Sequence, residues 1–455
     1  MNTKYIIILL LSTPALLFGQ HRIKGTFSPA GDYKTVLLYK VEPTVSQYIT
    51  NAPISKNGKF EIILDSTITK GMYRITYALP QEEYNFDVLY NGKENVELKF
   101  SDETGVEFIS SQENKLLESY TNSMLMITNS ISNYYADTSV NKDTTALHNI
   151  FKTQRETQKG FEDAAKGTIA LNFIKANKPF IPKKVIDVKT YITQLDTHYF
   201  DFVDFNNPVL QRSKFLTERM LNYVFGMSAG NEDESATYIK NIKTFNTKMK
   251  QAPTKIKKTL WTDLWEQMVD LKQETVANFI AENYLMDLAV NLNDQQLLSS
   301  LILYKDLAVG AKAPDFMIEI PQKDKKPSTK LLSSLNAHTN YVIVFWSSSC
   351  SHCLDEIPEL HNFSKTLAPK QLKVIAIALE NKPDKWNTLK RNFPNFLHVY
   401  GDGKWDNDIG NRYEVIATPT YFILDTNKTI VAKPEDFGDL KTYFEALTLT
   451  TQDKK

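Results

Sequence analysis

The sequence of 455 residues contains only two cysteines, Cys350 and Cys353. A protein with a single cysteine pair does not use disulfide bonds as the framework of its fold. A closed zinc site needs four ligands and is usually cysteine-rich, so this count also argues against structural zinc. A structural disulfide that closes so short a loop adds little stability. The pair therefore favours thiol exchange chemistry, and we expect no metal and no cofactor.

Neither sign of charge is in excess. Lysine and arginine together number 53, and so do aspartate and glutamate. This balance implies no general attraction to nucleic acid or to a membrane surface, so we expect no nucleic-acid partner. A hydrophobic content of 42% is ample for packed cores, and the length predicts two or three domains.

Long hydrophobic runs are scarce, and the clearest one stands at the start of the chain. Residues 1–19 combine Lys4, a short apolar stretch and a small residue, Gly19, which predicts a secretory signal peptide. Ser12-Thr13-Pro14 interrupts the apolar stretch, which is short for a membrane span. An uncleaved membrane anchor is the alternative. We therefore expect export to the periplasm or cell envelope.

Residues 20–107 are predicted to form an antiparallel β-sandwich. Apolar residues alternate in at least six short segments separated by turn residues. The Asn57-Gly58 pair is a strong hairpin signal. Seven tyrosines could form an exposed binding face, but core and cross-strand packing is the interpretation we favour. They are Tyr33, Tyr39, Tyr48, Tyr73, Tyr77, Tyr84 and Tyr90.

Residues 108–305 are predicted to be a helical region. Apolar residues recur there at helical spacing, for example Leu116, Tyr120, Met124 and Ile127. His148 and His198 stand apart from other metal-binding residue types in the sequence. We therefore expect the region to position the other domains, to recognise a partner or to form a homodimer, without chemistry of its own.

Residues 306–450 carry the cysteine pair. The run 341–345 is β-branched and aromatic and predicts a buried strand, and apolar residues after Cys353 recur at helical spacing. Cys350 thus lies where a helix begins. Unpaired N–H groups and the helix dipole stabilise a thiolate there and lower the cysteine pKa. Cys353, one turn further, is placed to attack a mixed disulfide.

The order of strand, Cys-x-x-Cys, helix, strand and helix is that of a thioredoxin-like motif. The last third of the chain resembles the ResA/TlpA group of exported thioredoxin-like proteins, with an α/β fold. The residues that carry this resemblance are Gly310-x-x-Ala313-Pro314-Asp315-Phe316, Phe345-Trp346-x-x-x-Cys350-x-x-Cys353-x-x-Glu356-x-Pro358 and Thr418-Pro419-Thr420. The two preceding regions also resemble the accessory domains of some bacterial envelope proteins. The expected fold class is therefore multidomain: a β-sandwich, a helical region and a C-terminal α/β thioredoxin-like domain.

The resemblance implies a role for each matching residue. Cys350 would be the attacking thiolate and Cys353 the resolving thiol, and the two would form the redox disulfide. Glu356 would handle the proton of Cys353, whereas Asp355 should point elsewhere; a surface charge is the alternative for Glu356. Thr418-Pro419 would form a cis-proline loop beside the sulfurs. The expected substrate-binding residues are Trp346, Ser351, His352, Thr418 and Pro419.

Two departures from the family pattern affect the expected redox properties. Ser349 replaces the bulky residue that often precedes the first cysteine, which opens the rim of the site. Ser351-His352 replaces the pair common in reducing members. A histidine that stabilises the Cys350 thiolate raises the reduction potential, so we expect a value more oxidising than about −270 mV, that of thioredoxin. The alternative for His352 is an exposed residue without effect.

The expected function is that of an exported thiol–disulfide oxidoreductase. Its partners would be cysteine-containing envelope proteins and a membrane or periplasmic redox partner that recycles the cysteines. The direction stays open, because Glu356 resembles reducing members and His352 suggests oxidation. A thiol peroxidase is one alternative, although Ile343 occupies the position where that chemistry wants proline. A ligand-binding or scaffold envelope protein with an auxiliary redox module is the other.

Overall fold

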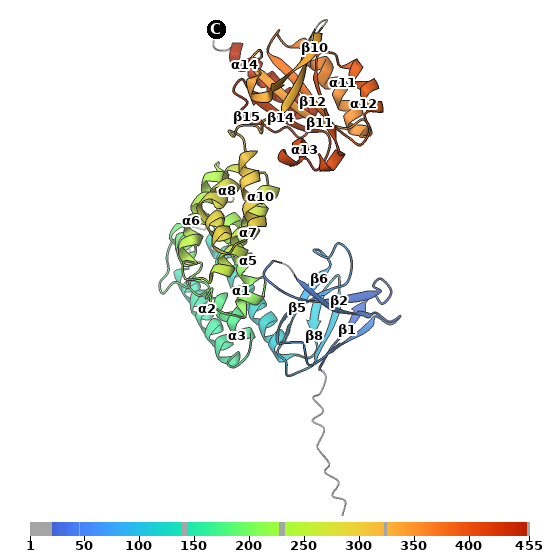
Figure 1. Cartoon of the computed structure of the whole chain (residues 1–455). Coiled ribbons are helices and arrows are strands. Elements are labelled where there is room, and N and C mark those ends of the chain that lie inside the picture. Colours follow the sequence, from blue (N-terminus) through green and yellow to red (C-terminus); the bar gives the residue numbers. More distant parts are fainter. Residues whose placement is uncertain (1–20, 45, 138–142, 227–232, 323–324, 453–455) are drawn as a thin grey trace, which may run out of the picture. The chain divides into compact units, whose positions relative to one another are not determined.

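The computed structural model describes residues 21–44, 46–137, 143–226, 233–322 and 325–452. The expected signal peptide, residues 1–19, lies outside these residues. The chain divides into two compact units, Met1–Leu264 and Trp265–Lys455, and each is described by itself (Figure 1). None of the helices described is long and apolar enough to cross a membrane.

The first unit begins with two four-stranded sheets. One sheet has the order β4-β1-β7-β8 and the other the order β3-β2-β5-β6. Neighbouring strands are antiparallel except β1 and β7, which are parallel. The strands are β1 (His21–Ser28), β2 (Thr35–Lys40), β3 (Gln47–Pro53), β4 (Lys59–Leu64), β5 (Gly71–Thr76), β6 (Asn85–Tyr90), β7 (Val96–Ser101) and β8 (Gly105–Phe108).

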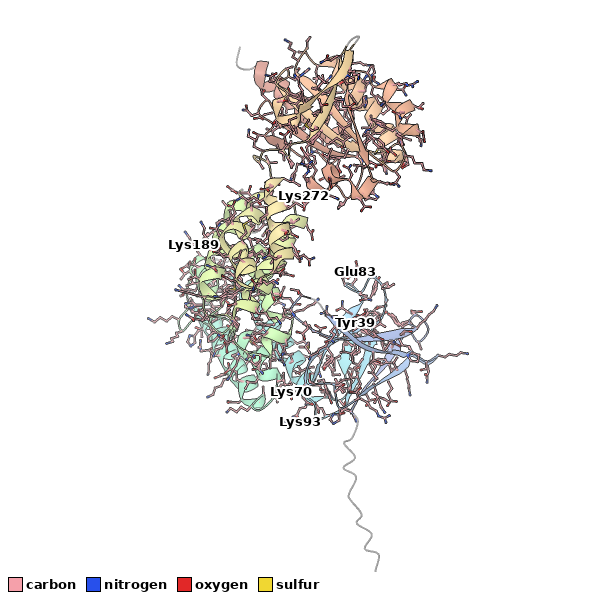
Figure 2. The ribbon with its side chains drawn as sticks, in the orientation of Figure 1. Tyr39, Lys70, Glu83, Lys93, Lys189 and Lys272 are labelled. Carbon is pink, nitrogen blue, oxygen red and sulfur yellow. The ribbon has the colours of Figure 1, made fainter. Side chains whose placement is uncertain are left out.

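The two sheets share one apolar core. β4 shows the alternation expected of a half-buried strand, with Phe60, Ile62 and Leu64 buried and the residues between them exposed. Four of the seven tyrosines illustrate the core and cross-strand packing favoured from the sequence. Tyr73 and Tyr90 are buried in the core. Tyr48 is exposed and packs edge-on against Tyr39, whose position is labelled in Figure 2.

The helices of the first unit follow the sandwich. Asn114, near the start of α1, is buried and binds both backbone groups of Leu89 on β6, at 2.8 and 2.7 Å. It thereby ties the helical region to the sandwich. The helices are α1 (Gln112–Ala136), α2 (Thr144–Ala164), α3 (Ala170–Ala176), α4 (Val188–Thr197), η1 (Leu210–Arg212), α5 (Phe215–Gly226) and α6 (Glu234–Lys248); the unit boundary falls within α7 (Thr254–Asp270).

The second unit starts with short helices that lead into an α/β domain. Glu274 on α8 pairs with Lys433, and its carboxylate also accepts the Val309 N–H at 2.9 Å. These contacts tie the helices of this unit to the domain that follows. The helices are α8 (Glu274–Ile280), η2 (Ala281–Leu285), α9 (Met286–Asn291) and α10 (Gln295–Asp306).

The α/β domain is built on a five-stranded sheet of order β13-β12-β11-β14-β15. β11 is central, parallel to β12 and antiparallel to β14. A separate hairpin pairs β9 with β10. The strands are β9 (Met317–Gln322), β10 (Lys325–Leu331), β11 (Asn340–Trp346), β12 (Leu372–Glu380), β13 (Leu397–Asp402), β14 (Thr420–Asp425) and β15 (Ile430–Ala432). The helices are η3 (Leu332–Ser334), α11 (Ser351–Thr366), α12 (Asp384–Leu389), η4 (Lys390–Asn392), η5 (Lys404–Asp406), α13 (Asp408–Arg412) and α14 (Phe437–Gln452).

Apolar side chains cover both faces of this sheet. Val342, Val344 and Trp346 of β11 point to one face and pack in a cluster that includes residues of α11 and α14. Tyr341, Ile343 and Phe345 point to the other face and pack in a cluster that includes residues of β9. A strand buried on both faces has the continuous apolar sequence seen here. The fold class predicted from the sequence is therefore confirmed.

Candidate active site

The cysteine pair lies at the junction of β11 and α11. β11 ends at Trp346, and Ser347 and Ser348 follow it as buried loop residues. Cys350 is the N-cap of α11, with an extended backbone at φ −90° and ψ 121°. A buried strand that ends directly before a helix start thus holds this cysteine at the helix N-terminus, as the sequence pattern predicted.

The sulfur of Cys350 caps the first turn of α11. It accepts the backbone N–H of Cys353 at 3.2 Å, and as a thiol it donates to the carbonyl oxygen of Thr418 at 3.2 Å. Partial burial raises the pKa of this thiol. Hydrogen bonds from the Cys353 thiol and from backbone N–H groups outweigh that effect, so the pKa lies below its usual value. Cys350 is therefore suited to be the nucleophile.

Cys353 differs from Cys350 in both burial and acidity. Its side chain is buried, whereas that of Cys350 is partly exposed, and both are free thiols in this structure. Burial and the hydrogen bond to the Cys350 sulfur raise the pKa of Cys353 to about 12. A partner disulfide can therefore reach Cys350 first, and Cys353 needs to lose a proton before it attacks.

Thr418-Pro419 lies beside the cysteines. The peptide bond between these residues is cis, and both side chains are partly buried. The 3.2 Å contact between Cys350 and the Thr418 carbonyl oxygen joins this loop to the helix start. Ser351 and His352 begin α11 and are exposed. A partner can thus meet all four of these residues beside the partly exposed sulfur.

Trp346 is placed differently from the other expected substrate-binding residues. Its side chain is 1% exposed, and its ring packs edge-on against Phe393 at 6.3 Å between centroids. The side chain faces the core under the site because β11 is buried on both faces. Trp346 thus supports the cysteine loop from within the domain, and in this structure it offers a partner no accessible surface.

Glu356 lies one turn beyond Cys353 on α11 and is half-buried. One carboxylate oxygen accepts two hydrogen bonds, from the Tyr421 hydroxyl and from the Phe437 N–H, both at 2.9 Å. The pKa of Tyr421 is raised by burial, then by the charges of Glu356 and Cys353. Asp355 is exposed. Glu356 is thus held on the side of α11 that faces β14 and α14.

Glu380 is a neighbour of the site that our sequence analysis missed. It is the last residue of β12 and is 7% exposed. Its carboxylate accepts the backbone N–H of Ser348, between Trp346 and Cys350 in the chain. The available signal was an acidic residue at the end of an apolar strand that follows the Cys-x-x-Cys helix.

Potential metal ligands do not gather anywhere in the part of the chain that the structure describes: it contains no group of three or more histidine, cysteine, aspartate or glutamate side chains that could hold an ion. His198, which stood alone in the sequence, contacts Asp201 and Gln194.

A match to one known family agrees with this description of the C-terminal domain. Residues 339–430 match the family described as thioredoxin-like, and no curated protein matches the chain. The solved structures that are similar to parts of it include the following three. A domain of a possible thiol-disulfide isomerase from Cytophaga hutchinsonii is 27% identical, with 32% of this chain and 97% of that chain covered and a TM-score of 0.27.

The other two come from Bacteroides species. The thioredoxin domain of a thiol-disulfide oxidoreductase from Bacteroides vulgatus is 20% identical, covering 31% of this chain and 97% of that chain with a TM-score of 0.27. A thioredoxin-like protein from Bacteroides caccae is 18% identical. The match covers 59% of this chain and 97% of that chain, with a TM-score of 0.32. The family match and the observed sheet together identify a thioredoxin-like domain at residues 339–430.

Proposed function

We propose that the protein is an exported thiol–disulfide oxidoreductase of the ResA/TlpA kind, which exchanges disulfides with cysteine-containing envelope proteins. The observation that carries this proposal is the unequal pair of sulfurs at the start of α11. The pKa of partly exposed Cys350 is lowered, whereas buried Cys353 has a pKa raised to about 12. The Cys350 sulfur is thus available as the nucleophile, and the Cys353 sulfur stays protonated until it resolves the mixed disulfide.

The exchange follows from this asymmetry. The Cys350 thiolate attacks one sulfur of a partner disulfide, so that a mixed disulfide forms and the partner's other sulfur leaves as a thiolate. The Cys353 thiol then loses its proton and attacks the Cys350 sulfur. The partner sulfur leaves Cys350 as a second thiolate, and Cys350 and Cys353 become a disulfide. The partner has then gained two electrons, and its two thiolates take up the proton released by Cys353 and one from solvent. The reverse sequence oxidises a partner dithiol.

Glu356 is the proposed acceptor of the proton from Cys353. It lies three residues further along α11, and side chains at that spacing share a helix face. The N–H of Phe437 and the hydroxyl of Tyr421 fix its carboxylate. A membrane or periplasmic redox partner then restores the starting state of the two cysteines.

A trapping experiment tests this function. Cys353→Ala leaves the attacking thiolate in place but removes the resolving sulfur, so it should accumulate mixed disulfides with envelope proteins through Cys350. Cys350→Ser is the matched control and should trap none. The proposal fails if the wild-type protein forms no Cys350–Cys353 disulfide in a glutathione redox buffer, or if both variants capture the same proteins.

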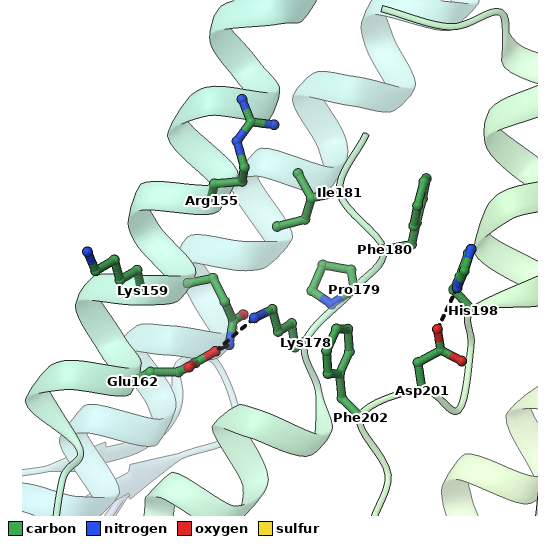
Figure 3. Close-up of a pocket in the computed structure, with 11 residues that line it drawn as sticks. Arg155, Lys159, Glu162, Lys178, Pro179, Phe180, Ile181, His198, Asp201 and Phe202 are labelled. Carbon is green, nitrogen blue, oxygen red and sulfur yellow. Dashed lines mark hydrogen bonds and ion pairs between the residues drawn. The ribbon is translucent and has the colours of Figure 1, made fainter. Parts of the chain in front are cut away.

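Ligand binding by the first unit is the second candidate, because its helical region contains a cavity of about 460 Å³ (Figure 3). The Phe180 ring stacks on His198 at 4.8 Å, and Lys178 lies over the Phe202 ring at 4.8 Å. Arg155 and Lys159 also line the cavity. A phenotype that survives Cys350→Ser but not the loss of these cavity residues would favour this function.

A further inference from the structure

Glu380 is a buried carboxylate in the α/β domain to which the exchange reaction assigns no role. β12 runs parallel to β11, with Ala378 opposite Trp346. Glu380 is therefore two residues further along and level with the loop that leaves β11. Its side chain is 7% exposed. The strand register thus brings a carboxylate to the residues that precede Cys350.

The carboxylate binds that loop directly. One oxygen accepts the backbone N–H of Ser348 and lies 3.4 Å from the Ser347 hydroxyl. Within the described residues, no lysine, arginine or histidine forms an ion pair with Glu380. Burial of a charge costs free energy unless hydrogen bonds compensate for it, so these two donors account for its place here.

Ser347, one of the two residues that Glu380 binds, also interacts with both cysteines. The carbonyl oxygen of Ser347 accepts the Cys350 N–H at 3.1 Å. The Ser347 hydroxyl accepts the Ser349 N–H at 3.3 Å and lies 3.0 Å from the Ser349 hydroxyl. The backbone of Ser347 also favours the thiolate of Cys353 and so acts to lower its pKa. A shift of this loop would therefore move the surroundings of both sulfurs.

We propose that Glu380 is a positioning residue that fixes the loop of Ser347 to Ser349 and thereby sets the reactivity of Cys350 and Cys353. This inference rests on the proposed thiol exchange. Glu380 contacts the loop and neither sulfur, so it acts as a hydrogen-bond acceptor for Ser348 and Ser347 rather than by the effect of its charge on a thiolate.

Three substitutions separate these roles. Glu380→Gln keeps an acceptor oxygen at the same reach but removes the charge. Glu380→Ala removes both, and Glu380→Asp keeps the charge but shortens the side chain by one methylene. Asp402→Ala is the matched control, because Asp402 lies opposite Glu380 in the register with β13, also at a strand end, and is exposed.

The readouts are the pH dependence of Cys350 alkylation and the reduction potential of the pair in glutathione buffers, with circular dichroism to verify folding. Glu380→Ala and Glu380→Asp should slow alkylation at pH 7 by about tenfold, which corresponds to a rise of about one unit in the Cys350 pKa. Both should also change the potential. Glu380→Gln and Asp402→Ala should stay close to wild type.

Two results would overturn the inference. One is wild-type alkylation and potential in folded Glu380→Ala, or in Glu380→Asp if the alanine variant does not fold. The other is a shift in Glu380→Gln as large as that in Glu380→Ala, which would assign the effect to charge. Failure of the proposed function is distinguishable, because the wild-type protein itself would then form no Cys350–Cys353 disulfide in these buffers.

Discussion

The hydroxyl of Tyr421 donates to the carboxylate of Glu356 at 2.9 Å, across 65 residues of sequence. Tyr421 follows the cis Thr418-Pro419 bond by two residues, and Glu356 follows Cys353 by three. This contact links the proline loop to the helix that carries both cysteines. It also fixes the direction of the carboxylate to which we assign the proton of the resolving thiol.

Glu356→Gln should slow the resolution of mixed disulfides, because the amide cannot accept the proton of Cys353. We expect a decrease of about a hundredfold, the lower end of the range for a lost general base. Rapid-quench measurement of the mixed disulfide with a model peptide would separate this step from the attack by Cys350, which should keep its rate.

Two further variants are controls for Glu356. Asp355→Asn removes the neighbouring, exposed carboxylate and should leave resolution unchanged. Tyr421→Phe removes one of the two donors to Glu356 and should have a smaller effect than Glu356→Gln, since the Phe437 N–H remains. An equal effect of Asp355→Asn and Glu356→Gln would contradict the assigned role.

Substitutions at His352 should separate its two possible contributions to the potential. The imidazole is exposed, whereas the backbone N–H favours the Cys350 thiolate. His352→Pro removes both and should lower the reduction potential; about 30 mV corresponds to roughly 1.4 kcal/mol of thiolate stabilisation.

His352→Ala keeps the N–H and removes only the imidazole. Equilibration of each variant with glutathione gives its potential. A potential in His352→Ala equal to that of the wild type would show that the imidazole contributes nothing, and an unchanged potential in His352→Pro would refute any role for this residue.

Asn114→Ala should weaken the attachment of α1 to the sandwich. The change leaves the N–H and the carbonyl group of Leu89 without their buried partner, at a cost of about 2 kcal/mol. Hydrogen exchange of the Leu89 amide in the full-length protein should become faster. Asn51→Ala is the control, because Asn51 is exposed and its side chain donates to the hydroxyl of the exposed Tyr48. Equal protection of Leu89 in both variants would contradict the structural role of Asn114.

The features of the site that the sequence predicted are local ones. The apolar run of β11 and the helical spacing of α11 fix where Cys350 stands, and both patterns lie within about thirty residues. The N-cap geometry follows from that boundary alone. The family pattern added Glu356, three residues after Cys353, and Thr418-Pro419, which is distant from the cysteines in sequence.

The features that the sequence did not reveal depend on tertiary register. Glu380 meets Ser348 only because β12 pairs with β11 in one particular register, and Tyr421 meets Glu356 only because β14 does so on the other side. The burial of Trp346 likewise follows from the layers above and below the sheet. β3 has one buried residue among its seven, so its sequence lacks the clear alternation of β4.

The most direct test of the central claim is the alkylation rate of Cys350 as a function of pH in the reduced protein, followed by mass spectrometry of the peptide that contains it. Hydrogen bonds from the Cys353 thiol and from backbone N–H groups outweigh the effect of burial and lower the pKa of Cys350, so the thiolate should persist at pH values where a free cysteine is protonated. The account predicts that alkylation reaches half of its maximal rate at a pH below the pKa of a free cysteine, which is about 8.5. A titration curve that matches that of free cysteine would contradict it.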